Sequence, residues 1–315
     1  MTPIALGRSG LTISPVVFGG NVFGWTLDEA GSFDMLDRMV QSGITTIDTA
    51  DGYSRWVEGH EGGESETIIG NWFAIRPGMR DKVQLITKVG TEVFGGGGLS
   101  KDWITTEVEQ SLKRLQTDRI DLYFSHFPDD NTPHEETLAA YETLIKAGKV
   151  RAIGASNFTV EQLRAAQSAA EANSLPAYDV IQPEYNLYAR ERFEGPIADF
   201  AQAQNLGVIP YFALAAGFLT GKYRTEADLK GPRGERSIGR YMNKKGQAIL
   251  AAMDSVAEDT GASHAAIALA WMRQRPGVTA PIASATSATQ FEALVEGATL
   301  NLSHDAINAL TKAGA

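Results

Sequence analysis

Short apolar runs alternate along the chain with longer segments in which apolar residues return every three or four positions. A short continuous apolar run predicts a strand buried on both faces, and the longer spacing predicts an amphipathic helix. Eight runs have the character of strands: Val16–Phe18, Thr45–Ile47, Val83–Thr87, Ile120–Phe124, Val150–Ile153, Val180–Gln182, Val208–Tyr211 and Thr279–Ile282.

Helices are predicted between these runs. Thr105–Leu115, Leu138–Ala147 and Val160–Ala172 each place their apolar residues on one face. Thr159 and Gln162 stand before the third helix at the spacing of a capping box. Three glycines stand where a helix is expected to end before a strand: Gly43, Gly148 and Gly207.

Eight strands alternating with helices predict an α/β fold, a (β/α)8 or TIM barrel, with residues 1–315 forming one barrel domain. The turn Gly7-Arg8-Ser9-Gly10 predicts an N-terminal β-hairpin, and a long loop is expected after strand 7. A doubly wound sheet is the alternative. The chain contains no G-x-G-x-x-G fingerprint, no G-x-x-x-x-G-K-[ST] phosphate loop and no G-x-S-x-G elbow, which argues against that alternative.

The composition of the chain excludes several classes of function. The chain has 28 basic and 38 acidic side chains, a formal charge of −10, and nucleic-acid binding would need a basic face instead. The absence of cysteine excludes disulfides, thiolate metal sites and thiol nucleophiles. The longest apolar stretch, Val208 to Leu219, is too short to span a bilayer, and the first residues lack a signal-peptide pattern. We therefore expect a cytoplasmic protein with no membrane or nucleic-acid partner.

Polar residues stand at the ends of three adjacent strands. Asp48 and Tyr53 follow strand 2, Lys88 follows strand 3, and His126 follows strand 4. Each residue alone has an ordinary structural explanation as a cap, a solvated edge or a hydrogen-bonded core residue. Because a barrel gathers the carboxyl ends of its strands at one mouth, we expect the four side chains to meet there.

These four residue types fit the reduction of a carbonyl group. A lysine ammonium about 4 Å from a phenol favours the phenolate by roughly 4 kcal/mol at an effective dielectric near 20, so Lys88 would make Tyr53 a better acid. Asp48 would keep Lys88 charged, and His126 would orient a substrate carbonyl. The hydride must come from a bound nicotinamide, because no side chain supplies one.

At these residues the chain resembles the aldo-keto reductase family. The resemblance is carried by seven segments: Leu6–Leu11, Gly43–Tyr53, Ile86–Lys88, Ser125–His126, Gly154–Phe158, Gln182–Asn186 and Leu219–Tyr223. It implies a monomer or weak homo-oligomer that acts on a small-molecule carbonyl substrate and binds NAD(P)H without a Rossmann domain. It also implies a catalytic tetrad of Asp48, Tyr53, Lys88 and His126.

The resemblance further implies where the cofactor lies. Ser156, Asn157 and Gln182 would bind the nicotinamide carboxamide, and Tyr211 would stack on the ring. Many relatives have Ser-Pro-Leu after strand 7, where this chain has Phe212-Ala213-Leu214, and Leu214 is the cofactor contact expected in that turn.

Relatives that grip a 2′-phosphate often carry Lys or Arg after strand 8, where Ser284, Thr286 and Gln290 stand here. Ser287 and Gln290 have the spacing of a capping box at the start of the final helix pattern. The segment Lys222–Lys245 holds eight basic and three acidic residues; a solvated loop explains it, and folding over the cofactor phosphates is the alternative. We expect NADPH to be preferred and NADH to be accepted.

Four aromatic residues follow barrel strands, where loops line the mouth: Trp25, Trp56, Phe94 and Phe127. Together they predict a substrate pocket for aromatic or medium-chain aldehydes and ketones.

Three other functions are compatible with parts of the sequence. A regulatory partner subunit of an ion channel shares this fold. A Schiff-base aldolase would use Lys88, but a nearby Asp48 would keep that lysine protonated. A metal site could be drawn from Glu58, His60, Glu61, Glu64 and Glu66, but one histidine and four glutamates among glycines favour a solvated loop, so no metal is expected.

Overall fold

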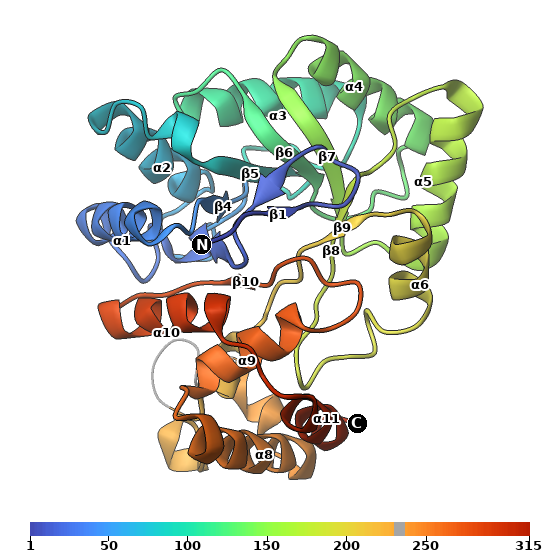
Figure 1. Ribbon diagram of the computed structural model, residues 1–315. Coiled ribbons are helices and arrows are strands. Elements are labelled where there is room, and N and C mark those ends of the chain that lie inside the picture. Colours follow the sequence, from blue (N-terminus) through green and yellow to red (C-terminus); the bar gives the residue numbers. More distant parts are fainter. Residues whose placement is uncertain (230–236) are drawn as a thin grey trace.

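The computed structural model describes residues 1–229 and 237–315, and within them the chain forms a parallel barrel surrounded by helices (Figure 1). Eight strands follow one another in the order β10-β3-β4-β5-β6-β7-β8-β9, and neighbouring strands are parallel. They are β3 (Val17–Gly19), β4 (Thr46–Asp48), β5 (Gln84–Val89), β6 (Ile120–Ser125), β7 (Val150–Ser156), β8 (Val180–Gln182), β9 (Gly207–Val208) and β10 (Ile282–Ala283). The predicted (β/α)8 fold is confirmed.

The barrel closes between β9 and β10. Thr279 N donates to Val208 O at 2.8 Å, and Ile282 N donates to Pro210 O at 2.9 Å. Closure brings the carboxyl ends of the strands to a common mouth, which is where barrels of this type place their chemistry.

Helices cover the outside of the barrel, as Figure 1 shows. They are α1 (Glu29–Ser42), α2 (Glu64–Ile75), α3 (Lys101–Arg114), α4 (His134–Lys146), α5 (Val160–Asn173), α6 (Pro196–Ala203), α8 (Lys244–Thr260), α9 (His264–Arg273), α10 (Ala288–Thr299) and α11 (His304–Ala313). The last helix, α11, packs on α8. Within the described ranges, no helix is both long and apolar enough to cross a membrane.

The predicted N-terminal hairpin is present as β1 (Ile4–Ala5) and β2 (Thr12–Ile13), an antiparallel pair. Leu6, Leu11 and Ile13 are buried in one cluster with residues from the barrel interior. Arg8 donates to Tyr178 O at 2.9 Å, just ahead of β8. The hairpin therefore covers the end of the barrel opposite the mouth.

Helix and strand boundaries differ from the prediction at particular residues. Asp48, Lys88 and Ser156 lie within their strands, because the hydrogen-bonded ladder continues through these polar positions. Gly43 ends α1 in the left-handed conformation as predicted. Gly207 does not end a helix: it is the first residue of β9, where a Cβ would press on the Leu6 side chain. Gly148 follows the end of α4 with a positive φ, and Thr159 and Gln162 form the predicted capping box.

Candidate active site

Lys88 is the centre of a buried polar cluster at the mouth. Its ammonium lies 2.7 Å from both carboxylate oxygens of Asp48, 2.8 Å from Thr49 O and 2.9 Å from Tyr53 Oη. Lys88 and Asp48 are buried. Burial lowers the pKa of Lys88 from its ordinary value, and the Asp48 carboxylate opposes that shift. A nitrogen whose hydrogens all face acceptors offers no lone pair, which argues against a Schiff-base nucleophile.

The Tyr53 hydroxyl donates to Asp48 Oδ2 at 3.0 Å and accepts from Lys88. Burial, and after it the Asp48 carboxylate, raises the pKa of the Tyr53 phenol well above its ordinary value of 10.0. This corrects the expectation that Lys88 would lower that pKa, because the carboxylate beside the phenol repels a phenolate while the ammonium attracts it. The phenol is protonated at neutral pH, which is the state that a proton donor requires.

His126 follows β6 directly, and its ring centroid lies 6.0 Å from that of Tyr53. Nδ1 lies 3.0 Å from Thr91 Oγ1. Burial, with the positive charges of Lys88 and Arg55, lowers the pKa of His126 well below 6.5. The imidazole is therefore neutral at pH 7 and carries one N–H.

The residues expected to hold a nicotinamide carboxamide lie together at the ends of β7, β8 and β9. Ser156 Oγ donates to Gln182 O at 2.9 Å, and Tyr211 Oη donates to Asn157 Oδ1 at 2.7 Å. Gln182 Nε2 donates to Asp48 Oδ1 at 2.9 Å, which joins this group to the Lys88 cluster. Gln182 Oε1 has no partner in the described part of the chain, so one amide acceptor remains available.

The residues after β10 make local hydrogen bonds. Ser284 Oγ lies 2.7 Å from Gly19 O, its acceptor. Gln290 Oε1 accepts from Thr286 N at 2.9 Å and from Thr286 Oγ1 at 3.0 Å. Ser287 Oγ caps α10 by accepting from Gln290 N at 3.3 Å, but the return bond reaches Thr286 N, so the predicted capping box is only half formed. These residues offer polar groups and no positive charge.

The turn after β9 is stabilised by its own backbone hydrogen bonds. Phe212 is 46% exposed and has a φ of 56°. The Arg240 guanidinium lies 5.9 Å from the Phe212 ring centroid. Leu214 O accepts backbone bonds from Gly217 N at 2.8 Å and Leu219 N at 3.2 Å, so it holds the turn together.

Part of the basic segment Lys222–Lys245 falls on residues 230–236, outside the described residues. Among those described, Lys222 lies over the Tyr223 ring and Lys245 lies over the Tyr188 ring. Arg224 forms a two-pronged ion pair with Asp254. These cations are paired with aromatic or acidic groups of the chain.

Aromatic side chains surround Tyr53 and His126. The Trp56 ring lies 6.3 Å from Tyr53 and 5.5 Å from Trp25, and Phe127 stacks on His126 at 4.7 Å. Trp56 and Phe127 are 38% and 46% exposed, so a ligand can reach them. Phe94 is separate from these rings, and Arg114 lies over it at 4.9 Å.

An acidic network behind the cluster corrects the expectation that Glu66 lies in a solvated loop, because Glu66 is in α2 and is buried. Glu66 is buried, accepts from Thr87 Oγ1 at 2.5 Å and pairs with Arg114, which also contacts Glu107. Asp51 is also buried. Its burial, and after it the negative charges of Glu66 and Glu107, raise the pKa of the Asp51 carboxyl well above its usual range. The Asp-Thr-Ala-Asp order in the sequence gave a signal for Asp51, but its partners come from other elements.

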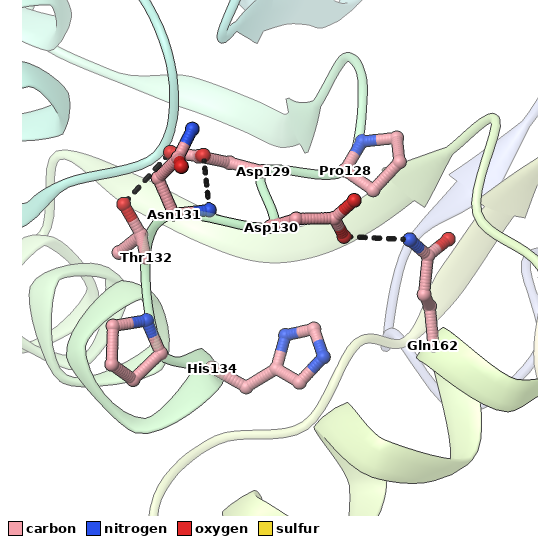
Figure 2. A pocket seen from close by; sticks show the side chains of 8 residues that line it. Pro128, Asp129, Asp130, Asn131, Thr132, His134 and Gln162 are labelled. Carbon is pink, nitrogen blue, oxygen red and sulfur yellow. Dashed lines mark hydrogen bonds between the residues drawn. The ribbon is translucent and has the colours of Figure 1, made fainter.

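The loop between β6 and α4 borders a separate cavity of about 310 Å³. Figure 2 shows two pairs of its side chains directed at each other, Asp129 with Thr132 and Asp130 with Gln162. Asp130 accepts from Gln162 at 3.2 Å, and Asp129 accepts from the Thr132 hydroxyl at 2.7 Å. As for metals, no group of three or more His, Asp or Glu side chains gathers as a metal site within the described part of the chain.

Comparison with known proteins identifies the class. The model of the Aldo/keto reductase family matches residues 15–315, nearly the whole chain. The chain therefore belongs to the aldo/keto reductase family of oxidoreductases, and the resemblance stated from the sequence is confirmed.

Individual relatives align with this chain over most of their own length. The "Uncharacterized oxidoreductase YrpG" of Bacillus subtilis (strain 168) is 35% identical over 313 residues, 97% of this chain and 93% of its own. The "Aldo-keto reductase YhdN" of the same organism is 36% identical over 312 residues, 95% and 88% of the two chains. A "Probable voltage-gated potassium channel subunit beta" of Arabidopsis thaliana is 32% identical over 303 residues, 91% and 88% of the two chains.

Proposed function

We propose that the protein reduces an aldehyde or ketone to an alcohol at the expense of NAD(P)H. The observation that carries the proposal is the hydrogen-bonded set in which Tyr53 Oη lies 2.9 Å from the Lys88 ammonium and 3.0 Å from Asp48. A protonated phenol beside a buried cation suits a group that must give a proton to a developing alkoxide.

The residues at the ends of β7 to β9 fit a nicotinamide. Gln182 Oε1 can accept from a carboxamide, and the half-buried Tyr211 offers an aromatic face. When bound, the cofactor supplies the hydride that becomes attached to the carbonyl carbon. Ser156 and Asn157 hold the neighbouring strand ends in register through Gln182 O and Tyr211.

Tyr53, Lys88 and His126 have distinct parts in this proposal. Tyr53 gives its proton to the carbonyl oxygen, so that a C–H and an O–H bond form as the C=O π bond is lost. Lys88 stabilises the phenolate that remains until solvent reprotonates it. His126, neutral, donates a hydrogen bond that fixes the carbonyl oxygen near Tyr53.

The aromatic side chains favour a substrate with an apolar body. Trp25, Trp56 and Phe127 lie beside Tyr53 and His126, and we propose that they bind aromatic or medium-chain aldehydes and ketones. Higher kcat/KM for a sugar phosphate than for benzaldehyde would contradict this substrate class.

The reaction is tested with a panel of aldehydes and ketones, followed through NAD(P)H absorbance. Tyr53→Phe is expected to lower kcat by at least about 100-fold, because only the phenol proton reaches the alkoxide. Cofactor affinity, measured by fluorescence titration, should stay near that of the wild type, and Lys88→Met should lose activity similarly. A Tyr53→Phe variant that keeps most of its kcat would overturn the role of Tyr53.

A regulatory subunit is the competing function, favoured by the similarity to the probable channel subunit of Arabidopsis. The two functions differ in turnover. Tight retention of NADPH without turnover of any panel substrate would favour the regulatory function, whereas steady-state reduction would favour the enzyme.

A further inference from the structure

Thr91 has no part in the mechanism described so far. It follows β5 by two residues, and its side chain is nearly closed off from solvent, at 6% exposure. Its hydroxyl oxygen lies 3.0 Å from His126 Nδ1. In the described part of the chain, this is the only hydrogen bond of the Thr91 hydroxyl.

The two tautomers of His126 satisfy this pair unequally. If the imidazole hydrogen is on Nδ1, it points at Thr91 Oγ1, and the hydroxyl hydrogen is left without an acceptor in a nearly closed site. If the hydrogen is on Nε2, the hydroxyl donates to the Nδ1 lone pair, and both groups are satisfied. Buried hydroxyl groups are expected to be hydrogen-bonded, so the pair favours the Nε2–H tautomer.

We propose that Thr91 is a positioning residue that holds His126 as the Nε2–H tautomer and so turns its single N–H toward the substrate carbonyl. The inference rests on the proposed carbonyl reduction. His126 Nε2 has no hydrogen-bond partner among the residues that the structure describes, so it is available to a ligand. The opposite tautomer would face the carbonyl oxygen with a lone pair and repel it.

The fold holds both partners in place. A Cβ on Gly52 would lie 2.7 Å from Thr91 Cγ2, so the glycine backbone beside Tyr53 packs directly on the threonine methyl group. On the other side, Phe127 stacks on His126 with an interplanar angle of 17°. Asn157 Nδ2 donates to the His126 carbonyl oxygen at 2.9 Å. The turn Asp51-Gly52-Tyr53 therefore carries the tyrosine and also packs against Thr91, which contacts His126.

Thr91→Val and Thr91→Ser form the matched pair that tests the proposal. Valine keeps the shape and removes the hydroxyl, and serine keeps the hydroxyl. Thr91→Val is expected to lower kcat for carbonyl reduction by about 10- to 100-fold, the scale on which loss of a hydrogen bond that orients a functional histidine acts. Thr91→Ser should stay within a few-fold of the wild type, and cofactor affinity should be unchanged in both.

A spectroscopic readout tests the tautomer without activity. The chain has five histidines, so the ¹⁵N ring signals of His126 can be assigned by comparison with a His126→Gln sample. The wild type and Thr91→Ser should show an Nε2–H pattern, and Thr91→Val should show a mixture or the Nδ1–H form. An unchanged pattern in Thr91→Val, or an Nδ1–H pattern in the wild type, would overturn the proposal.

The spectra and the kinetics together distinguish a failure of the proposed carbonyl reduction from a failure of the proposed role of Thr91. A wild type that shows the Nε2–H pattern but reduces no carbonyl would overturn the proposed function and leave the tautomer assignment standing. A Thr91→Val variant with wild-type kcat and a changed tautomer would show that His126 does not act through Nε2–H. Thermal unfolding of both variants checks that valine has not disturbed the fold.

Discussion

The Tyr53 phenol and the His126 imidazole are both neutral because of where the chain buries them. Burial and Asp48 raise the pKa of Tyr53, and burial with two nearby cations lowers the pKa of His126. The two shifts have opposite directions and the same result: each group keeps the form that can donate a hydrogen at pH 7. The meeting of both residues was predictable from the sequence, but the predicted direction of the Tyr53 pKa shift was wrong, because the Asp48 carboxylate is as close to the phenol as the Lys88 ammonium.

A flat pH profile follows from these shifts. A histidine with a lowered pKa becomes charged only well below 6.5, and a phenol with a raised pKa loses its proton only above 10.0. Lys88 must also stay charged, and because burial lowers its pKa, any alkaline limb would come from its ammonium. We expect kcat for reduction, with saturating cofactor and substrate, to change less than about two-fold between about pH 6.5 and 8. Measuring with NADH as well as NADPH removes the titration of the 2′-phosphate. A limb centred near pH 6.5 with both cofactors would show that His126 titrates during the reaction.

At the scale of elements, the order of strands and helices was predictable and their ends were not. Parallel strands that are buried on both faces consist of short continuous apolar runs, which polar loops do not contain. The ladder nevertheless continues through Lys88 and Ser156, and β9 begins at Gly207, because pairing with a neighbour decides where a strand ends. The network of Glu66, Arg114 and Glu107 depends on the contact between α2 and α3, which spacing along one helix does not reveal.

Gly70 sets the distance between α2 and α3. A Cβ at Gly70 would overlap the carbonyl oxygen of Arg114 at the end of α3. We expect Gly70→Ala to lower the free energy of unfolding by about 1–3 kcal/mol, the usual cost of overpacking, although alanine favours helix more than glycine. Denaturant titration gives the value.

Gly31→Ala in the first turn of α1 is the matched control. There a Cβ would meet only the side chains of Asp28 and Leu27. This variant should unfold within about 0.5 kcal/mol of the wild type or be more stable. Equal losses in the two variants would show that the α2–α3 contact does not cause the effect.

At the scale of the whole molecule, the order of the strands explains why the meeting of these polar side chains could be predicted from one sequence. Asp48, Lys88 and His126 come from β4, β5 and the end of β6, which are neighbours in the sheet. Their meeting follows from strand order alone. Thr91 and Asp51 could not be assigned in that way, because their contacts depend on the paths of loops rather than on the order of strands.

The preference between NADPH and NADH depends on the charge of the whole molecule and on the N-terminal end of one helix, α10. The formal charge of −10 repels an anionic cofactor at long range, and the residues after β10 add no cation to hold a 2′-phosphate. At the start of α10, the amides of Ala288 and Thr289 have no acceptor in the described part of the chain. A helix start favours an anion by roughly 0.3–1 kcal/mol, so we expect kcat/KM to favour NADPH over NADH by only a few-fold.

Gln290→Glu tests whether the 2′-phosphate lies at this helix start. Gln290 Oε1 already accepts from Thr286, so the carboxylate can keep that bond while adding a negative charge beside the free amides. If the 2′-phosphate binds there, kcat/KM for NADPH should fall several-fold and by much more than the value for NADH, because the added charge lies next to the 2′-phosphate, whereas the pyrophosphate is common to both cofactors. Equal effects on both cofactors would place the phosphate elsewhere. A wild-type ratio that favours NADH would show that neither this helix nor the cations of Lys222–Lys245 reach the adenosine ribose.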